Sequence, residues 1–245
     1  MIFEFIEVLL WYIAVILCLL MAVMFYLEYK SRKGFSSPFF LGLSIFGVTY
    51  AVARLIENIR RYIVGSYSDI VEAWIRGEQI TGINFTLRML YYLIAWFGMS
   101  LMFYNIEHYI LTDNRYIITI FSIIAGLVSI INYLYLNMIT FWAAVICYFV
   151  TAYFISIMFL NAARKAQSTY IRNGCLLVAL GIMTLAIGIM IDLPEAVYFA
   201  HLYGIGYSEF IVRLLAPILF ILGLVIFTIG LKTRFRITKI SDEIG

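Results

Sequence analysis

The sequence has little charge: Asp, Glu, Lys and Arg make up 13% of its 245 residues, against 64% for hydrophobic residues. A soluble domain typically contains about 25% charged residues. This chain therefore has too few polar side chains to cover a surface that faces water, which excludes a soluble globular domain. The net charge is only +3, and this small basic excess gives no indication of nucleic-acid binding.

Cysteine and histidine are also scarce, with three and two residues. Cys18, Cys147 and Cys175 lie at three different expected depths in their segments. They therefore predict neither a disulfide framework nor a metal site. His108 and His201 are expected on opposite sides of a membrane, so they cannot bind one zinc ion or bracket one haem. We expect no metal and no cofactor.

Several membrane enzymes are excluded by what they require. None of the five lysines lies in the middle of an apolar segment, which excludes a retinal bound through a Schiff base. Intramembrane serine proteolysis needs a Ser–His pair, and Ser100 has no histidine at its depth. Lipid-phosphate and prenyl transferases use clustered carboxylates that hold Mg²⁺, and the sequence contains no such motif. We therefore expect no enzymatic activity.

Long apolar segments are abundant, and seven of them approach or exceed the roughly 20 residues that a helix needs to cross a bilayer. They cover residues 6–28, 37–62, 84–110, 116–136, 140–162, 171–193 and 209–231. None alternates as a barrel strand does, and helices satisfy their own backbone groups within lipid. The sequence predicts a single all-α domain over residues 1–245, a polytopic bundle of seven transmembrane helices. Residues 232–245 are the expected short cytoplasmic tail.

Basic residues predict the orientation, because cytoplasmic loops are enriched in Lys and Arg. All five lysines fall on one side of the predicted bundle, with Arg32, Arg115 and Arg164 among others. The other side mixes arginines with a larger number of Asp and Glu residues. We expect a multi-pass protein of the cell membrane, with its N-terminus outside and its C-terminus in the cytoplasm.

The third and seventh segments resemble each other. They contain FTLRMLYYLIAWFG from residue 85 and FIVRLLAPILFILG from residue 210, which aligns Arg88 with Arg213. A similar offset aligns Glu57 in the second segment with Asp192 in the sixth. These matches favour the hypothesis of a parallel 3+1+3 repeat, in which the fourth helix joins two halves.

The second segment ends in ARLIENIRRY, residues 53–62, where polar residues follow one another at spacings of three and four. Such spacings place side chains on one face of a helix, here directed into the bundle: Arg54, Glu57, Asn58 and Arg61. Counted from Phe39 at about 1.5 Å per residue, Arg54 lies roughly 22 Å into a hydrocarbon core about 30 Å thick. Arg60 and Arg61 are expected in the outer headgroups.

Other polar residues are predicted to meet this stripe. Arg88 enters the third helix at a similar depth to Glu57, which predicts an ion pair between them, with Asp192 and Arg213 as the equivalent pair. Trp96 belongs to an aromatic row farther along the third helix. The candidate ligand-binding residues are Arg54, Glu57, Asn58, Arg88, Trp96, Asp192 and Arg213. At the opposite end of the third helix, Asn105, Glu107 and His108 are expected to form a solvated helix end.

Two interpretations of the stripe remain open. Charged groups inside a membrane are costly and are functional candidates by default, which favours a polar vestibule that binds a small polar or amphipathic ligand from outside. Alternatively, the acid–arginine pairs only join the outer ends of helices, and Arg54 extends its guanidinium toward the interface.

The predicted helix number, outward N-terminus, short cytoplasmic loops and RLIENIRR stretch together resemble the seven-transmembrane-helix sensory modules of prokaryotic signalling proteins. The resemblance is one of topology, covers the whole chain and transfers no residue roles. It implies a receptor or sensor. Because those modules usually feed a cytoplasmic output domain, we expect signalling through a separate cytoplasmic or membrane protein partner.

Two alternatives are a packing subunit of a larger membrane complex and a small 3+1+3 transporter. The transporter alternative resembles the seven-helix carriers that export sugars and amino acids. Those carriers have prolines at corresponding positions of both halves, whereas here Pro38 lies at the very start of one predicted span and only Pro217 lies well inside one. The lack of a matching proline counts against the transporter.

Overall fold

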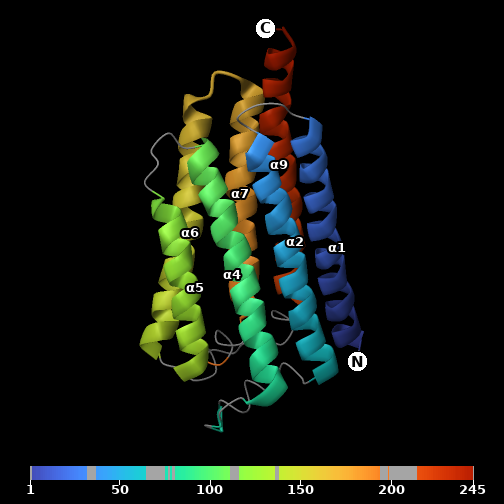
Figure 1. Cartoon of the computed structure of the whole chain (residues 1–245), viewed down its shortest axis with the longest axis vertical. Helices are drawn as coiled ribbons and strands as arrows, with labels where there is room; N and C mark the ends of the chain where they lie inside the picture. The colour runs from blue at the N-terminus through green and yellow to red at the C-terminus, as the bar shows by residue number, and fades with distance from the viewer. Residues whose placement is uncertain are drawn as a thin grey trace.

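The computed structural model describes residues 2–31, 37–64, 75–76, 78, 81–110, 116–135, 138–193, 198 and 214–244. They form seven α-helices and one π-helical turn: α1 (Ile2–Ser31), α2 (Ser37–Ile59), η1 (Arg60–Val64), α4 (Gly82–Ile110), α5 (Ile117–Tyr135), α6 (Met138–Lys165), α7 (Thr169–Ile191) and α9 (Ala216–Ile244). The prediction of an all-helical bundle is confirmed (Figure 1).

Five of these helices are long and apolar enough to cross a membrane: Phe5–Ser31, Ser37–Val64, Gly82–His108, Thr169–Ile191 and Ala216–Thr233. This agrees with a membrane protein. The remaining two spans, the orientation and the internal repeat stay predictions. Residues 209–213, the predicted start of the seventh span, lie outside the described residues. At its other end α9 continues to Ile244, so the segment expected as a tail prolongs the last helix.

The helices form a closed ring. Each helix packs against the next one along the chain, and α1 packs against α9. In Figure 1 the helices run roughly along the long axis of the molecule. Their inner faces bury large apolar side chains such as Trp11, Leu43 and Phe227, while Leu20 and Phe97 are exposed on the outside. An apolar outer surface is what a lipid environment requires.

The closest helix pair is α7 with α9, whose backbones touch through small residues spaced seven apart. Seven residues are about two helical turns, so residues at this spacing share one face: Gly174, Gly181 and Gly188 on α7, and Ala216, Gly223 and Gly230 on α9. A Cβ on Gly181 would lie 2.5 Å from the backbone nitrogen of Phe227, and one on Gly188 would lie 2.8 Å from that of Phe220. The order of these contacts shows that the two helices are antiparallel.

The end of α4 caps the start of α5. The carboxylate of Glu107 accepts hydrogen bonds from the backbone N–H groups of Ile118 and Thr119, at 2.7 and 2.8 Å, and from the Thr119 hydroxyl. A carboxylate favours a helix N-terminus because the first N–H groups have no partner within the helix. Glu107 and Asn105 are buried, so the prediction of a solvated helix end is wrong for both.

Glu107→Ala is expected to lower the melting temperature, because it leaves buried N–H groups without an acceptor. Loss of such a cap costs about 2 kcal/mol, which corresponds to a fall of about 4–8 °C for a chain of this size. Thermal unfolding in detergent measures the change. Glu107→Gln retains one acceptor oxygen, so its melting temperature should fall less than that of Glu107→Ala. Equal melting temperatures for Glu107→Ala and the unmodified protein would contradict the capping role.

Candidate functional site

Charged side chains meet at one end of the ring, where α1 begins, α2 passes into η1, α4 begins and α7 ends (lower end in Figure 1). We call them the arginine cluster: Arg54, Arg60, Arg61 and Arg88 with Glu7, Glu57 and Asp192. All seven are buried. A buried charge is tolerated only when it is paired and hydrogen-bonded, so the geometry of the pairs decides what the cluster does.

Glu57 is the shared acceptor of three arginines. Its carboxylate accepts hydrogen bonds from Nε and Nη2 of Arg60 at 2.9 and 2.8 Å, from Nε of Arg61 at 2.8 Å and from Nη1 of Arg88 at 2.7 Å. Arg88 also donates to the hydroxyl of Tyr92 at 3.0 Å. The predicted Glu57–Arg88 pair is confirmed, and it links α2 to α4.

The structure places Arg60 in the buried cluster, which corrects the prediction from the sequence. On an ideal helix it lies about a third of a turn away from the Arg54–Arg61 stripe, and the sequence placed both Arg60 and Arg61 in the outer headgroups. In the structure the last turn widens into the π-helical η1 at Arg60, and both arginines are buried. A π turn takes one more residue than an α turn and shifts the following side chains around the axis.

Asp192 follows the last residue of α7 and joins this helix to α2 and η1. Its Oδ2 accepts from Nη1 of Arg54 at 2.7 Å, its Oδ1 accepts from Nη1 of Arg61 at 2.9 Å, and Nη2 of Arg61 donates to its backbone carbonyl at 3.3 Å. A carboxylate is unfavourable at a helix C-terminus, where the dipole is negative, and the two arginines compensate for it. Arg61 also lies 3.5 Å from Glu7 of α1.

Arg54 is enclosed by aromatic rings. Its guanidinium carbon lies 3.7 Å from the ring centroid of Trp11, 5.6 Å from that of Phe220 and 5.7 Å from that of Tyr91. A guanidinium over the face of a tryptophan is attracted to the ring electrons, more strongly when water is excluded. The rings fix the plane of Arg54, and its edge is the part left for polar contacts.

That edge has no acceptor among the described residues. Nη1 of Arg54 donates to Asp192, whereas Nε and Nη2 of this fully buried side chain make no hydrogen bond. Asn58, one turn later on α2, has neither its Oδ1 nor its Nδ2 bonded, and Nη1 of Arg60 also lacks an acceptor. Unpaired polar atoms at such burial are rare and indicate a bound water, ion or ligand.

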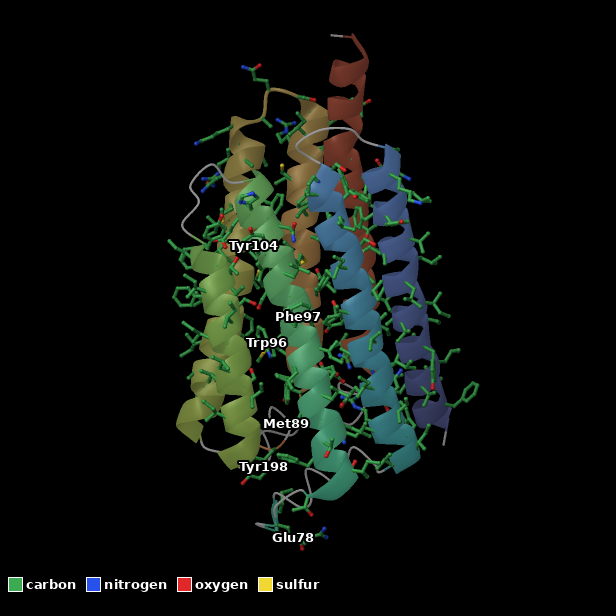
Figure 2. The ribbon with its side chains drawn as sticks, in the orientation of Figure 1. Glu78, Met89, Trp96, Phe97, Tyr104 and Tyr198 are labelled. Carbon is green, nitrogen blue, oxygen red and sulfur yellow. The ribbon has the colours of Figure 1, made fainter. Side chains whose placement is uncertain are left out.

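The predicted site residues divide into three groups. Arg54, Glu57, Asn58 and Arg61 form one buried stripe as predicted; Asp192 joins it through Arg54 and Arg61, and Arg88 joins it through Glu57. Arg213, the predicted partner of Asp192, lies outside the described residues. Trp96 lies apart from the cluster, about halfway along α4 in Figure 2, and packs against Gly126 of α5, where an added Cβ would be 2.9 Å from its ring.

Sequence reasoning did not assign Glu7 or Trp11 to the site. Both lie on α1 four residues apart and are buried, so they face the same side of the helix. That spacing of an acid and a tryptophan is visible in the sequence, but nothing in it indicates that α1 lies against the end of α2.

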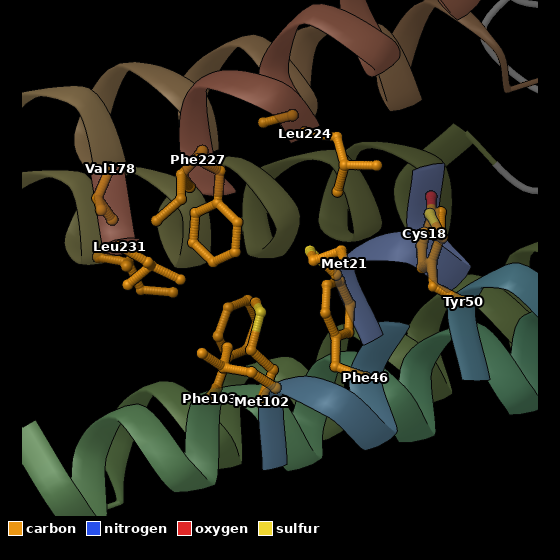
Figure 3. Close-up of a cluster of buried hydrophobic side chains, with 14 of the residues drawn as sticks. Cys18, Met21, Phe46, Tyr50, Met102, Phe103, Val178, Leu224, Phe227 and Leu231 are labelled. Atoms are coloured by element: carbon orange, nitrogen blue, oxygen red, sulfur yellow. The ribbon is translucent and has the colours of Figure 1, made fainter. Parts of the chain in front are cut away.

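An apolar cavity of about 50 Å³ lies in the centre of the ring next to the cluster. Its lining comes from α1, α2, α4, α6, α7 and α9 and is apolar apart from Tyr50 and Thr151. Figure 3 shows several of these side chains, among them Phe46, Phe103 and Leu224, converging from different helices. The volume is three to five times the ~10–15 Å³ that one water molecule needs.

Comparison with known proteins gives no further assignment. No protein-family model, no curated protein and no solved structure matches the chain. Among the described residues, no group of three or more His, Cys, Asp or Glu side chains is placed to hold a metal ion. The chemistry of the arginine cluster is therefore the observation from which a function is inferred.

Proposed function

We propose that the protein is a seven-helix membrane receptor or sensor that binds an anionic ligand at the arginine cluster and signals through a separate protein. The observation that carries the proposal is the Nε–Nη2 edge of Arg54, buried and without an acceptor among the described residues. The two N–H groups of this edge can donate parallel hydrogen bonds to two oxygens of a carboxylate or phosphate. The proposed function is binding and includes no reaction.

The charge of the cluster supports an anion. Four arginines face three carboxylates, which leaves one positive charge in excess among the described residues of the cluster. An uncompensated charge in a buried site is unfavourable, and an anion on Arg54 would neutralise it.

The position of the cluster supports signalling. Its ion pairs join α1, α2 with η1, α4 and α7, and Phe220 of α9 lies beside Arg54. An anion on the Nε–Nη2 edge leaves Nη1 bonded to Asp192, but it shares the charge of the guanidinium and repels the Asp192 carboxylate, so binding weakens the contact between α2 and α7. A ligand shifts a conformational equilibrium only through such a difference in contacts.

The proposed topology places this end of the ring outside the cell. The N-terminus belongs to the same end (Figure 1), and the distribution of lysines favours an outward N-terminus. The ligand would then enter from outside, and the basic opposite end would face the signalling partner.

Arg54→Lys is expected to abolish retention of the ligand while the protein stays folded. Lysine keeps the positive charge beside Asp192 but has no planar fork for two oxygens. Native mass spectrometry of protein extracted gently from its own membrane should show a small molecule on the unmodified protein and none on Arg54→Lys. The matched control is Arg76→Lys, at an exposed arginine paired with Glu78, which should retain the molecule.

Other outcomes contradict the proposal. A spectrum with only the bare protein, unchanged in Arg54→Lys, would show that water satisfies the cluster and that its role is structural. A second protein held at fixed stoichiometry, with no small molecule, would indicate a packing subunit of a larger complex.

A further inference from the structure

We propose that the ligand is a small amphipathic anion, whose head binds the free edge of Arg54 and the amide of Asn58 and whose short apolar tail occupies the central cavity. The proposal rests on the proposed function and adds the chemical class of the ligand. It follows from the fact that a polar site with unmet hydrogen bonds and an apolar cavity lie against the same two aromatic rings.

Tyr50 and Phe220 belong to both places. They line the cavity, and their rings stack with centroids 5.2 Å apart at an angle of 12°. On the other side, Phe220 lies 5.6 Å from the guanidinium carbon of Arg54 and 5.8 Å from the ring centroid of Trp11. Tyr50 precedes Arg54 by one turn of α2, on the same face. These two rings therefore border both the cavity and the head site.

The head site favours a planar or tetrahedral oxyanion. Nε and Nη2 lie along one edge of the guanidinium and present parallel N–H groups, while Nη1 is held by Asp192. Asn58 follows four residues later with both polar atoms unbonded, so its amide can donate to the same head. A cationic head such as an ammonium has no acceptor for the donors of Arg54, and a neutral oxygen accepts from them more weakly than a carboxylate or phosphate does.

The cavity favours a tail of a few carbon atoms. Its roughly 50 Å³ accommodates a short chain, and an apolar lining does not satisfy the hydrogen bonds of water. Each buried methylene group strengthens binding about fourfold. On the scale on which about 150 Å³ holds benzene, this cavity takes the last two or three carbons of the tail, and the remaining carbons pass between Tyr50 and Phe220. A carboxylate with a chain of about six carbons combines both requirements.

The test uses three probes with the protein in nanodiscs of neutral lipid: hexanoate, with head and tail, acetate, with the head alone, and hexanol, with the tail alone. Titration calorimetry or a thermal shift measures binding. Hexanoate is expected to bind at least about tenfold more tightly than acetate, and hexanol should bind more weakly than hexanoate. Equal affinities of acetate and hexanoate would overturn the inference.

Two cavity variants test the position of the tail. Ala152→Leu fills the cavity and should weaken hexanoate at least about tenfold while leaving acetate unchanged; Ala152 is a buried lining residue of α6. Ile182→Ala enlarges the cavity and should shift the preference from hexanoate to octanoate. The matched control is Ile146→Phe, which adds bulk to an exposed position of the same helix as Ala152 and should leave hexanoate binding unchanged.

Arg54→Lys and the two cavity variants together distinguish a failure of this inference from a failure of the proposed function. If Arg54→Lys weakens acetate and hexanoate equally and neither cavity variant affects hexanoate, the cluster binds anions but the tail assignment is wrong. If Arg54→Lys leaves hexanoate binding unchanged, both the head assignment and the proposed function are wrong.

The ligand can be a dissolved molecule or an anionic lipid of the membrane, since both carry an oxyanion beside an apolar chain. Replacing part of the neutral lipid with phosphatidylglycerol distinguishes them. Displacement of hexanoate by this lipid assigns the site to a lipid head, whereas unchanged hexanoate binding assigns it to a dissolved ligand. In both cases hexanoate binds, so both results support the head-and-tail site.

Discussion

Glu57→Gln is expected to lower the thermal stability of the protein strongly. Glutamine has one carbonyl oxygen in place of a carboxylate that accepts four hydrogen bonds from three arginines, and its amide donors face guanidinium donors. Glu57 is fully buried, so water cannot replace the lost interactions. Breaking a buried ion pair on one side costs about 3–5 kcal/mol, which corresponds to a melting temperature lower by about 6–20 °C.

The matched control is Glu78→Gln. Glu78 is paired with Arg76 at 3.2 Å, but both side chains are more than half exposed, and such pairs contribute about 0–1 kcal/mol. Its melting temperature should not change measurably. Thermal unfolding in one detergent compares the two variants with the unmodified protein.

A double variant distinguishes lost charge balance from lost packing. Glu57 is the only residue to which Arg60 is hydrogen-bonded within the described part of the chain. Glu57→Gln with Arg60→Gln therefore removes one acid and one arginine together, and it should be more stable than Glu57→Gln alone. If the double variant is less stable than the single one, the damage comes from packing and the electrostatic account is wrong.

The polar stripe of the second segment can be predicted from the sequence because it depends only on the period of an α-helix. Polar residues at 54, 57, 58 and 61 fall on one face of any α-helix, and the structure buries all of them. Arg88 could be paired with Glu57 because the depth of each is fixed by counting along an apolar segment. Depth alone was not sufficient for Arg60 and Arg61, which the count placed in the outer headgroups and the structure buries.

The rest depends on which helices become neighbours. Asp192 is paired with Arg54 of α2 and Arg61 of η1, partners that the sequence did not predict, while its predicted partner Arg213 lies outside the described residues. This contact exists because the ring brings the end of α7 against the end of α2. The contact between Trp11 and Arg54 likewise could not be predicted from the sequence, since hydrophobicity does not distinguish a tryptophan facing lipid from one facing a guanidinium. The π turn that buries Arg60 has no sequence signature of its own.

The glycines of α7 and α9 show a different limit of prediction from the sequence. Their spacing of seven is plain in the sequence, and the last helix repeats it from Ala216 to Gly230. Glycine is common in membrane helices for several reasons, so the spacing becomes informative only when two such faces meet. In the structure they meet backbone to backbone, and this contact sets the position of Phe220 in the candidate site.

Gly223→Leu is expected to prevent correct folding, because no space exists for its side chain. A Cβ at Gly223 would lie 2.6 Å from the backbone nitrogen of Leu185 and 2.9 Å from the carbonyl oxygen of Gly181. These are backbone atoms, so α7 and α9 must separate. Overpacking typically costs about 1–3 kcal/mol, and more where no rearrangement is available. Size-exclusion chromatography and thermal unfolding should show aggregation or a melting temperature lower by about 10 °C. The matched control, Val225→Leu, adds bulk to the exposed side of α9 and should behave like the unmodified protein.

Gly223→Ala tests whether this contact also governs the site. A single methyl group meets the same backbone atoms but requires a smaller shift of α9, so the variant should fold with reduced stability. Phe220 lies less than one turn from Gly223 on α9 and contacts both Arg54 and Tyr50. A shift of α9 therefore alters the boundary between the arginine cluster and the cavity. Hexanoate affinity should change in Gly223→Ala, whereas acetate affinity, which depends on Arg54 and Asn58 of α2, should change less. If Gly223→Ala melts like the unmodified protein, the backbone contact is looser than the structure shows and α9 does not control the site.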